Sequence, residues 1–144
     1  MKKVLVIATI MILGIILTAI SSCKKSDPDP DFPQLIGAWS GTTSQDGPIY
    51  FYVDNIKGTL YIKSYNTKIY TSNGYQSLQS TNDAGITAIS GKSFRISLGT
   101  GSAGPAFIDG NFNLSDMSLS GNFAVYASGN TVDIVTGTYI AYKK

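Results

Sequence analysis

The sequence predicts an all-β protein, most simply a small antiparallel meander barrel of about seven to nine strands, with a β-sandwich as the alternative. Three observations lead to this fold class. Thr, Tyr, Phe, Ile and Val dominate the stretches between turns, which is a strand composition. Turn signals rich in Gly, Asn, Asp and Ser recur at short intervals. No apolar stripe with a helical period persists for three turns.

The strands are predicted from short apolar runs between these turns. In chain order they fall at residues 37–39, 49–53, 60–63, 93–98, 106–113, 118–125 and 137–139. Residues 93–98 alternate cleanly between apolar and polar types, as in a strand buried on one face. Residues 49–53 (Ile-Tyr-Phe-Tyr-Val) are nearly continuous in apolar character, which predicts a strand that is central or buried on both faces.

A weak repeat of glycine, a polar residue and an aromatic residue favours the barrel. It occurs at residues 110–112, 121–123 and 137–139. Folding the chain at the intervening turns places Gly110 opposite Gly121, and Gly121 near Gly137. Glycines stacked across strands let a sheet bend sharply, and neighbouring aromatic rings can cover them. Such curvature suits a closed barrel better than a flat sandwich.

The two ends of this β region carry a resemblance to a known fold. The start, Gly37-Ala38-Trp39, and the final Gly-x-Tyr unit at residues 137–139 look like those of lipocalin-like or avidin-like meander barrels. The resemblance implies that the tryptophan of the first strand closes one end of the barrel. It also implies that the last strand pairs with the first.

The N-terminus has the pattern of an export signal. Lys2 and Lys3 precede an uncharged, mostly apolar run at residues 4–20, which is long for a signal peptide and short for a spanning helix. The next residues, Ile20-Ser21-Ser22-Cys23, resemble the lipobox of bacterial lipoprotein precursors. A plain N-terminal membrane anchor and a soluble secreted product are the alternatives.

The lipobox resemblance implies a domain organisation and a location. Residues 1–22 are the signal peptide, and Ile20, Ser21 and Ser22 are recognised by the signal peptidase. Cys23 becomes a diacylglyceryl cysteine that also carries an N-linked fatty acid such as palmitate, and two or three chains anchor a protein stably. Residues 23–33 form an acidic, Pro-rich tether, and residues 34–144 form the β domain. Lys24 in place of Asp implies the outer membrane of a bacterial cell envelope, facing the periplasm or the exterior.

Composition argues against several functions. The chain has no His, no Glu and one Cys, and all nine acidic residues are Asp. It therefore lacks Ser-His-Asp machinery, histidine metal ligands and Cys-rich zinc sites. The net charge of +2 is too small to indicate nucleic-acid binding. We expect no cofactor and no enzymatic activity. The alternative is a hydrolase that uses a pair of the domain's aspartates: Asp46, Asp54, Asp83, Asp109, Asp116 and Asp133.

A candidate binding surface lies in residues 63–82. Tyr65, Tyr70 and Tyr75 occur there among amide and hydroxyl side chains, which together can stack on and hydrogen-bond a glycan or a protein partner. A polar edge hairpin, core tyrosines or a long loop are the other interpretations. The predicted function is a non-catalytic binding or accessory module of the cell envelope, and the alternative is a barrel that carries a small apolar ligand inside. The sequence leaves the oligomeric state open.

Overall fold

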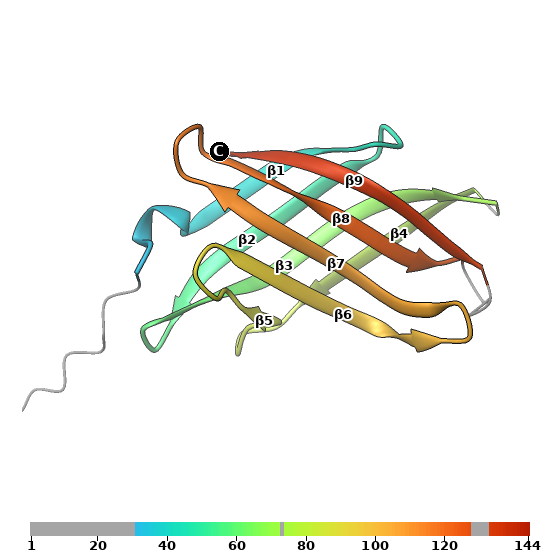
Figure 1. Cartoon of the computed structure of the whole chain (residues 1–144). Coiled ribbons are helices and arrows are strands. Elements are labelled where there is room, and N and C mark those ends of the chain that lie inside the picture. The colour runs from blue at the N-terminus through green and yellow to red at the C-terminus, as the bar shows by residue number, and fades with distance from the viewer. Residues whose placement is uncertain (1–30, 73, 128–132) are drawn as a thin grey trace, which may run out of the picture.

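A computed structural model describes residues 31–72, 74–127 and 133–144 of the chain. The lipobox residues Ile20, Ser21, Ser22 and Cys23 lie outside these ranges, so the lipoprotein interpretation stays a prediction. A 3-10 turn, η1, precedes nine strands (Figure 1). The elements are η1 Pro33–Leu35, β1 Gly37–Thr43, β2 Pro48–Ile56, β3 Thr59–Thr71, β4 Gly74–Thr81, β5 Thr87–Ala88, β6 Ser93–Gly101, β7 Gly104–Asn113, β8 Ser118–Tyr126 and β9 Ile134–Lys143.

All nine strands belong to one antiparallel sheet. The order across the sheet is β4-β3-β2-β1-β9-β8-β7-β6, so every neighbour pair is a hairpin except β1 and β9. These two strands pair from Trp39 opposite Lys143 to Thr43 opposite Tyr139. The pairing of the last strand with the first is therefore confirmed. It also joins two halves, strands β1–β4 and strands β6–β9, into one curled sheet. The all-β meander barrel therefore forms, and the β-sandwich alternative does not.

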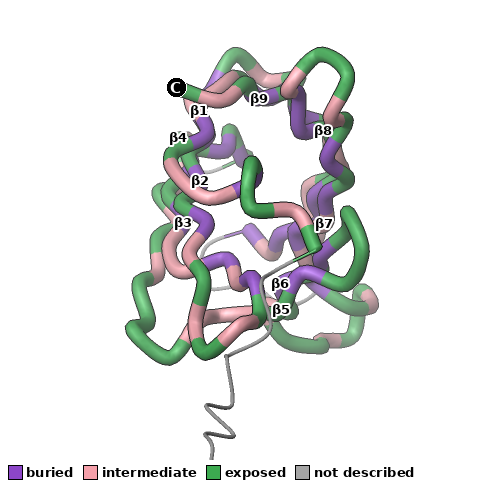
Figure 2. The backbone as a smooth tube through the Cα atoms, turned by 90° about the vertical axis from the view of Figure 1, so that its left-hand side faces the viewer, coloured by how far each residue is buried: buried purple, intermediate pink, exposed green. Residues whose placement is uncertain are grey.

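The barrel is incompletely closed, because its two edge strands, β4 and β6, do not pair with each other. The short strand β5 lies beside β6 at one end of this seam (Figure 2). It pairs with β3 through Tyr61–Ala88 and Ile62–Thr87. The Thr87 hydroxyl donates a hydrogen bond of 3.0 Å to the carbonyl of Arg95 in β6. One end of the seam is thus bridged, while β4 and β6 separate towards the other end.

Buried positions lie on both sides of the barrel (purple in Figure 2). Their side chains form one core of aromatic and aliphatic residues. Trp39 of β1 contacts Phe112 of β7 edge-on, with ring centroids 4.9 Å apart. Phe112 contacts Phe94 of β6 at 5.8 Å, and Phe94 contacts Phe51 of β2 at 5.4 Å. Phe51 also lies 5.4 Å from Tyr139 of β9. These rings form one continuous line across the barrel, which couples strands that are far apart in the sheet.

Glycines on β7 and β8 let the sheet bend, as the repeat predicted. A methyl group on Gly121 would lie 1.9 Å from the carbonyl oxygen of Asp109 and 2.9 Å from the Cα of Gly110. The two backbones therefore approach more closely than any side chain would allow. The prediction for Gly137 is wrong in register, because Gly137 pairs with Phe123 and Gly121 pairs with Tyr139. The Phe123 ring covers Gly137 instead.

The turn η1 lies across one end of the barrel (Figure 2). Leu35 in this turn is fully buried, and its carbonyl accepts a 2.9 Å hydrogen bond from the Trp39 indole nitrogen. That bond satisfies the one polar atom of a side chain that is otherwise enclosed. The first-strand tryptophan therefore helps to close this end, as the resemblance to lipocalin-like barrels implied.

Candidate ligand-binding site

Among the described residues, the exposed large apolar side chains point outward from one part of the barrel. Four are tyrosines of β2, β3 and β4, and two more residues come from β9. With their exposed fractions they are Tyr50 50%, Tyr52 41%, Tyr70 56%, Tyr75 66%, Ile140 42% and Tyr142 51%. Because β9 and β2 both flank β1, these side chains share one continuous outer face. The gathering of exposed tyrosines on β2, β3 and β4 indicates an interaction surface rather than a requirement of the fold.

Strand β2 contributes two of these tyrosines because it alternates strictly. Ile49, Phe51 and Val53 point into the core, while Tyr50 and Tyr52 point outward. Of the two alternatives for residues 49–53, burial on both faces is therefore wrong, whereas the central position is confirmed, because β2 lies between β1 and β3. The strand is half-buried, and its apparent continuity arises because tyrosine has an apolar ring that tolerates solvent.

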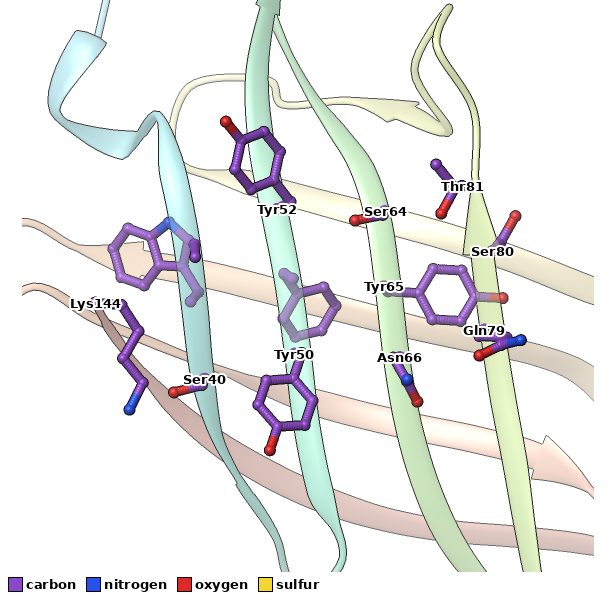
Figure 3. Close-up of a pocket in the computed structure, with 13 residues that line it drawn as sticks. Ser40, Tyr50, Tyr52, Ser64, Tyr65, Asn66, Gln79, Ser80, Thr81 and Lys144 are labelled. Atoms are coloured by element: carbon purple, nitrogen blue, oxygen red, sulfur yellow. The ribbon is translucent and has the colours of Figure 1, made fainter.

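A groove of about 640 Å³ lies over this face, and we call it the tyrosine groove (Figure 3). Side chains of β1 to β4 and the C-terminal residue line it: Ala38, Trp39, Ser40, Tyr50, Phe51, Tyr52, Ser64, Tyr65, Asn66, Gln79, Ser80, Thr81 and Lys144. The two exposed tyrosines follow one another along β2, with hydroxyl and amide side chains of β3 and β4 beside them. The inward-pointing residues alternate with these along the same strands.

Sheet register aligns the polar groups of the groove into rows. Tyr50 is opposite Asn66, which is opposite Gln79 on the next strand. Tyr52 is opposite Ser64, which is opposite Thr81. Neighbouring strands lie about 4.8 Å apart, so each row presents an aromatic ring beside closely spaced hydrogen-bond donors and acceptors. In the described part of the chain, no Asp or Glu side chain lines the groove, and Lys144 is the one basic residue that does.

A second hollow of about 360 Å³ adjoins the groove two residues further along each strand, and we call it the distal hollow. It is lined by Asp46, Gly47, Pro48, Lys68, Tyr75 and Ser77. Tyr75 packs edge-on against Tyr70, with ring centroids 5.4 Å apart. The backbone nitrogen of Tyr70 donates a 2.8 Å hydrogen bond to the side-chain oxygen of Gln45. A fixed aromatic pair therefore stands at this end of the face.

The tyrosines predicted from residues 63–82 are divided between the two sides of the sheet. This segment forms the hairpin of β3 and β4, and β4 is an edge strand, so the edge-hairpin interpretation describes it and the long loop does not. Tyr70 and Tyr75 are exposed, but Tyr65 is only 8% exposed and belongs to the core. Burial raises the pKa of the Tyr65 phenol. Tyr50 and Tyr52 of β2, which the sequence did not single out, are exposed instead.

Asp54, Asp83 and Asp116 are engaged in local contacts. Lys63 lies between two of them, with its ammonium nitrogen 3.3 Å from Asp54 and 3.4 Å from Asp83. Hydrogen bonds to Asp54 and then to Asp83 raise the pKa of Lys63. Asp116 accepts hydrogen bonds from the backbone and hydroxyl of Ser118. Among the described residues, no three acidic, His or Cys side chains gather as a metal site.

Asp109 organises the outer surface of the opposite half of the barrel. Its carboxylate accepts hydrogen bonds from the backbone and amide of Asn122 and forms a 3.0 Å ion pair with Arg95. Burial alone would raise the pKa of Asp109, but these bonds outweigh burial and hold it below its ordinary value. The Arg95 guanidinium also lies 4.2 Å from the centre of the Phe107 ring.

Comparison of the chain with family models, with curated proteins and with solved structures finds no match. In the described part of the chain, no helix has the length and apolar character needed to cross a bilayer.

Proposed function

We propose that the protein is a lipid-anchored lipoprotein of a bacterial cell envelope whose β domain binds a ligand without catalysing a reaction. The observation that carries the binding role is the tyrosine groove. Exposed rings and hydrogen-bonding side chains from four neighbouring strands meet in one hollow there. A surface that combines flat apolar faces with amides and hydroxyls suits recognition by stacking and hydrogen bonding.

The chemistry of the groove favours binding over catalysis. General acid–base hydrolysis by carboxylates needs two of them facing a substrate, one with a raised pKa. Within the described ranges, no Asp or Glu side chain lines the groove. Asp54 and Asp83 share an ion-paired lysine instead, and Asp109 has a lowered pKa. The hydrogen bonds to Asp109 stabilise its ionised carboxylate, which is the opposite of what a catalytic acid requires.

Carriage of a small apolar ligand inside the barrel has less support. Five rings from both halves of the sheet contact one another across the interior. A ligand would have to displace these contacts, whereas the tyrosine groove is open to solvent.

The lipid anchor is tested by replacing the acylated side chain. In cells that produce the Cys23→Ala variant, we expect a protein without lipid. It either leaves the membrane fraction once the signal peptide is removed or accumulates as the unprocessed precursor. Metabolic labelling with an alkynyl fatty acid followed by immunoblotting detects the acylated form directly. Wild-type protein that stays in the membrane without incorporating label would show that a plain N-terminal anchor holds it.

The binding role is tested with insoluble cell-envelope material as the probe. The wild-type chain, purified in a non-ionic detergent, should sediment with this material. The double variant Tyr50→Thr/Tyr52→Thr should remain in solution, because it loses both rings while threonine keeps the strand propensity. Tyr142→Thr is the matched control, since Tyr142 is as exposed as Tyr50 but does not line the groove. Equal sedimentation of all three proteins would contradict the proposed site.

A further inference from the structure

The tyrosine groove and the distal hollow form one elongated track. The groove takes in Asn66 of β3 and Gln79 of β4, and the hollow takes in Lys68 and Ser77, the next outward residues on the same two strands. Register pairs Asn66 with Gln79 and Lys68 with Ser77, so no inward-pointing residue interrupts this outer face. A ligand in one hollow therefore lies beside the other.

The length of the track indicates a chain-like ligand. From Thr81 in the groove to Tyr75 in the hollow, β4 advances six residues, or about 20 Å at 3.4 Å per residue. Tyr50 and Tyr52, two residues apart on β2, are separated by about 7 Å, which suits successive rings of one molecule. Tyr75 and Tyr70 provide another aromatic contact at the far end. A single small molecule would leave most of these positions unused.

The charge of the track indicates a neutral ligand. The described lining of the tyrosine groove has hydroxyl and amide side chains and no Asp or Glu, with Lys144 as its basic member. The distal hollow holds one acid and one base, Asp46 and Lys68. A polyanion would require a row of cations along the track, and the lining does not provide one.

We propose that the ligand is a neutral glycan chain that lies along β3 and β4 with sugar rings stacked on Tyr50, Tyr52 and Tyr75. This inference rests on the proposed binding function and specifies its ligand. The apolar faces of the sugar rings cover the tyrosines, and their hydroxyls exchange hydrogen bonds with Asn66 and Gln79 between them. Amide side chains suit this role because each offers both donors and an acceptor to neighbouring hydroxyls.

The first experiment is calorimetric titration of the full-length chain in detergent with soluble polysaccharides. The neutral set is a glucan, a mannan, a xylan and a galactan, and the charged set is alginate and polygalacturonate. We expect binding to at least one neutral polymer and weaker binding to the charged ones. In Tyr50→Thr/Tyr52→Thr, affinity should fall by about 10-fold or more for each ring, while Tyr142→Thr stays within about 2-fold of wild type. Binding only to the charged set, or to none of these polymers, overturns the proposal.

The second experiment tests whether the ligand spans the track. Oligosaccharides of increasing length from the bound polymer should gain affinity with each added sugar until they fill about 20 Å, and then level off. Tyr75→Thr should weaken the longer oligosaccharides and leave the shortest ones unaffected. Equal affinity for the shortest and the longest oligosaccharide would overturn the chain-like ligand.

Chemical treatment of the envelope material separates failure of this inference from failure of the proposed function. Periodate cleaves the vicinal diols of sugars, so it should abolish sedimentation of the wild-type chain with the material, while protease digestion should not. If protease abolishes sedimentation and periodate does not, the ligand is a protein: the glycan inference fails, and the binding function of the groove stands. If Tyr50→Thr/Tyr52→Thr binds the untreated material as well as wild type does, both fail.

Discussion

Strands β2–β4 and strands β6–β8 line the same interior, yet their outer faces carry different side chains. Inside, Phe51 of β2 and Phe94 of β6 meet in one line of rings. Outside, β2–β4 present four exposed tyrosines, whereas no large apolar side chain of β6–β8 is exposed to this degree. The outer polar groups of β6–β8 bond to one another around Asp109. On the outer face of β6–β8, polar side chains therefore bond to each other. On the outer face of β2–β4, the tyrosine rings are exposed to solvent and could contact a ligand.

The largest expected effect tests the interior that the two sets of strands share. Phe112→Ala removes a fully buried ring that contacts Trp39 and Phe94. We expect the free energy of unfolding, measured by urea denaturation, to fall by about 3–5 kcal/mol. Tyr50→Thr on the outer face should lower it by less than about 1 kcal/mol. Similar losses for the two variants would show that the outer tyrosines also stabilise the fold.

A smaller effect tests the bend of β7 and β8. The added methyl group of Gly121→Ala would collide with the Asp109 carbonyl oxygen, so we expect a loss of about 3 kcal/mol, the upper end of the usual cost of overpacking. Gly74→Ala on β4 is the comparison, because no atom lies within 4 Å of the new methyl group. Its positive φ of 95° should cost about 1 kcal/mol. Equal melting temperatures for the two variants would contradict a bend that depends on Gly121.

The smallest effect tests the electrostatics of the outer face of β6–β8. The pKa of Asp109 is lower in the folded state than in the unfolded chain, so its ionised form stabilises the fold. This contribution is fully present above the unfolded pKa of about 4 and is lost as the pH falls through the lower, folded pKa. Asp109→Asn should therefore flatten the decline of the free energy of unfolding in urea titrations at acidic pH. An unchanged pH profile would show that Asp109 is not responsible for it.

The interior and the meander could be predicted from the sequence because their side chains are unambiguous. Residues 93–98 alternate between apolar residues and Ser or Arg, and the structure places them in β6 with Phe94 and Ile96 buried. The glycine repeat could locate the close approach of Gly110 and Gly121, since no other residue permits it. The periodicity of the strands and the steric limits of the backbone therefore made most of the fold predictable.

The candidate binding face could be predicted only in part, as Tyr70 and Tyr75, because tyrosine and threonine occur on both sides of this sheet. In β3 the inward residues include Tyr65, Thr67 and Thr71, so the buried side does not stand out as apolar. In β2 the outward tyrosines hide the alternation, although aliphatic residues and Phe alternate with Tyr at residues 49–53. Because tyrosine is amphipathic, its alternation with Ile, Phe and Val at residues 49–53 indicates which face is exposed.

The hydrogen bond between the Trp39 indole and the Leu35 carbonyl has an optical consequence. Trp39 is the only tryptophan in the chain, and it lies buried where η1, β1 and β7 meet. The emission spectrum of an indole shifts towards longer wavelengths when water reaches it. The native protein thus carries its own fluorescent reporter, which detects loosening of η1 at this end of the barrel without any attached dye.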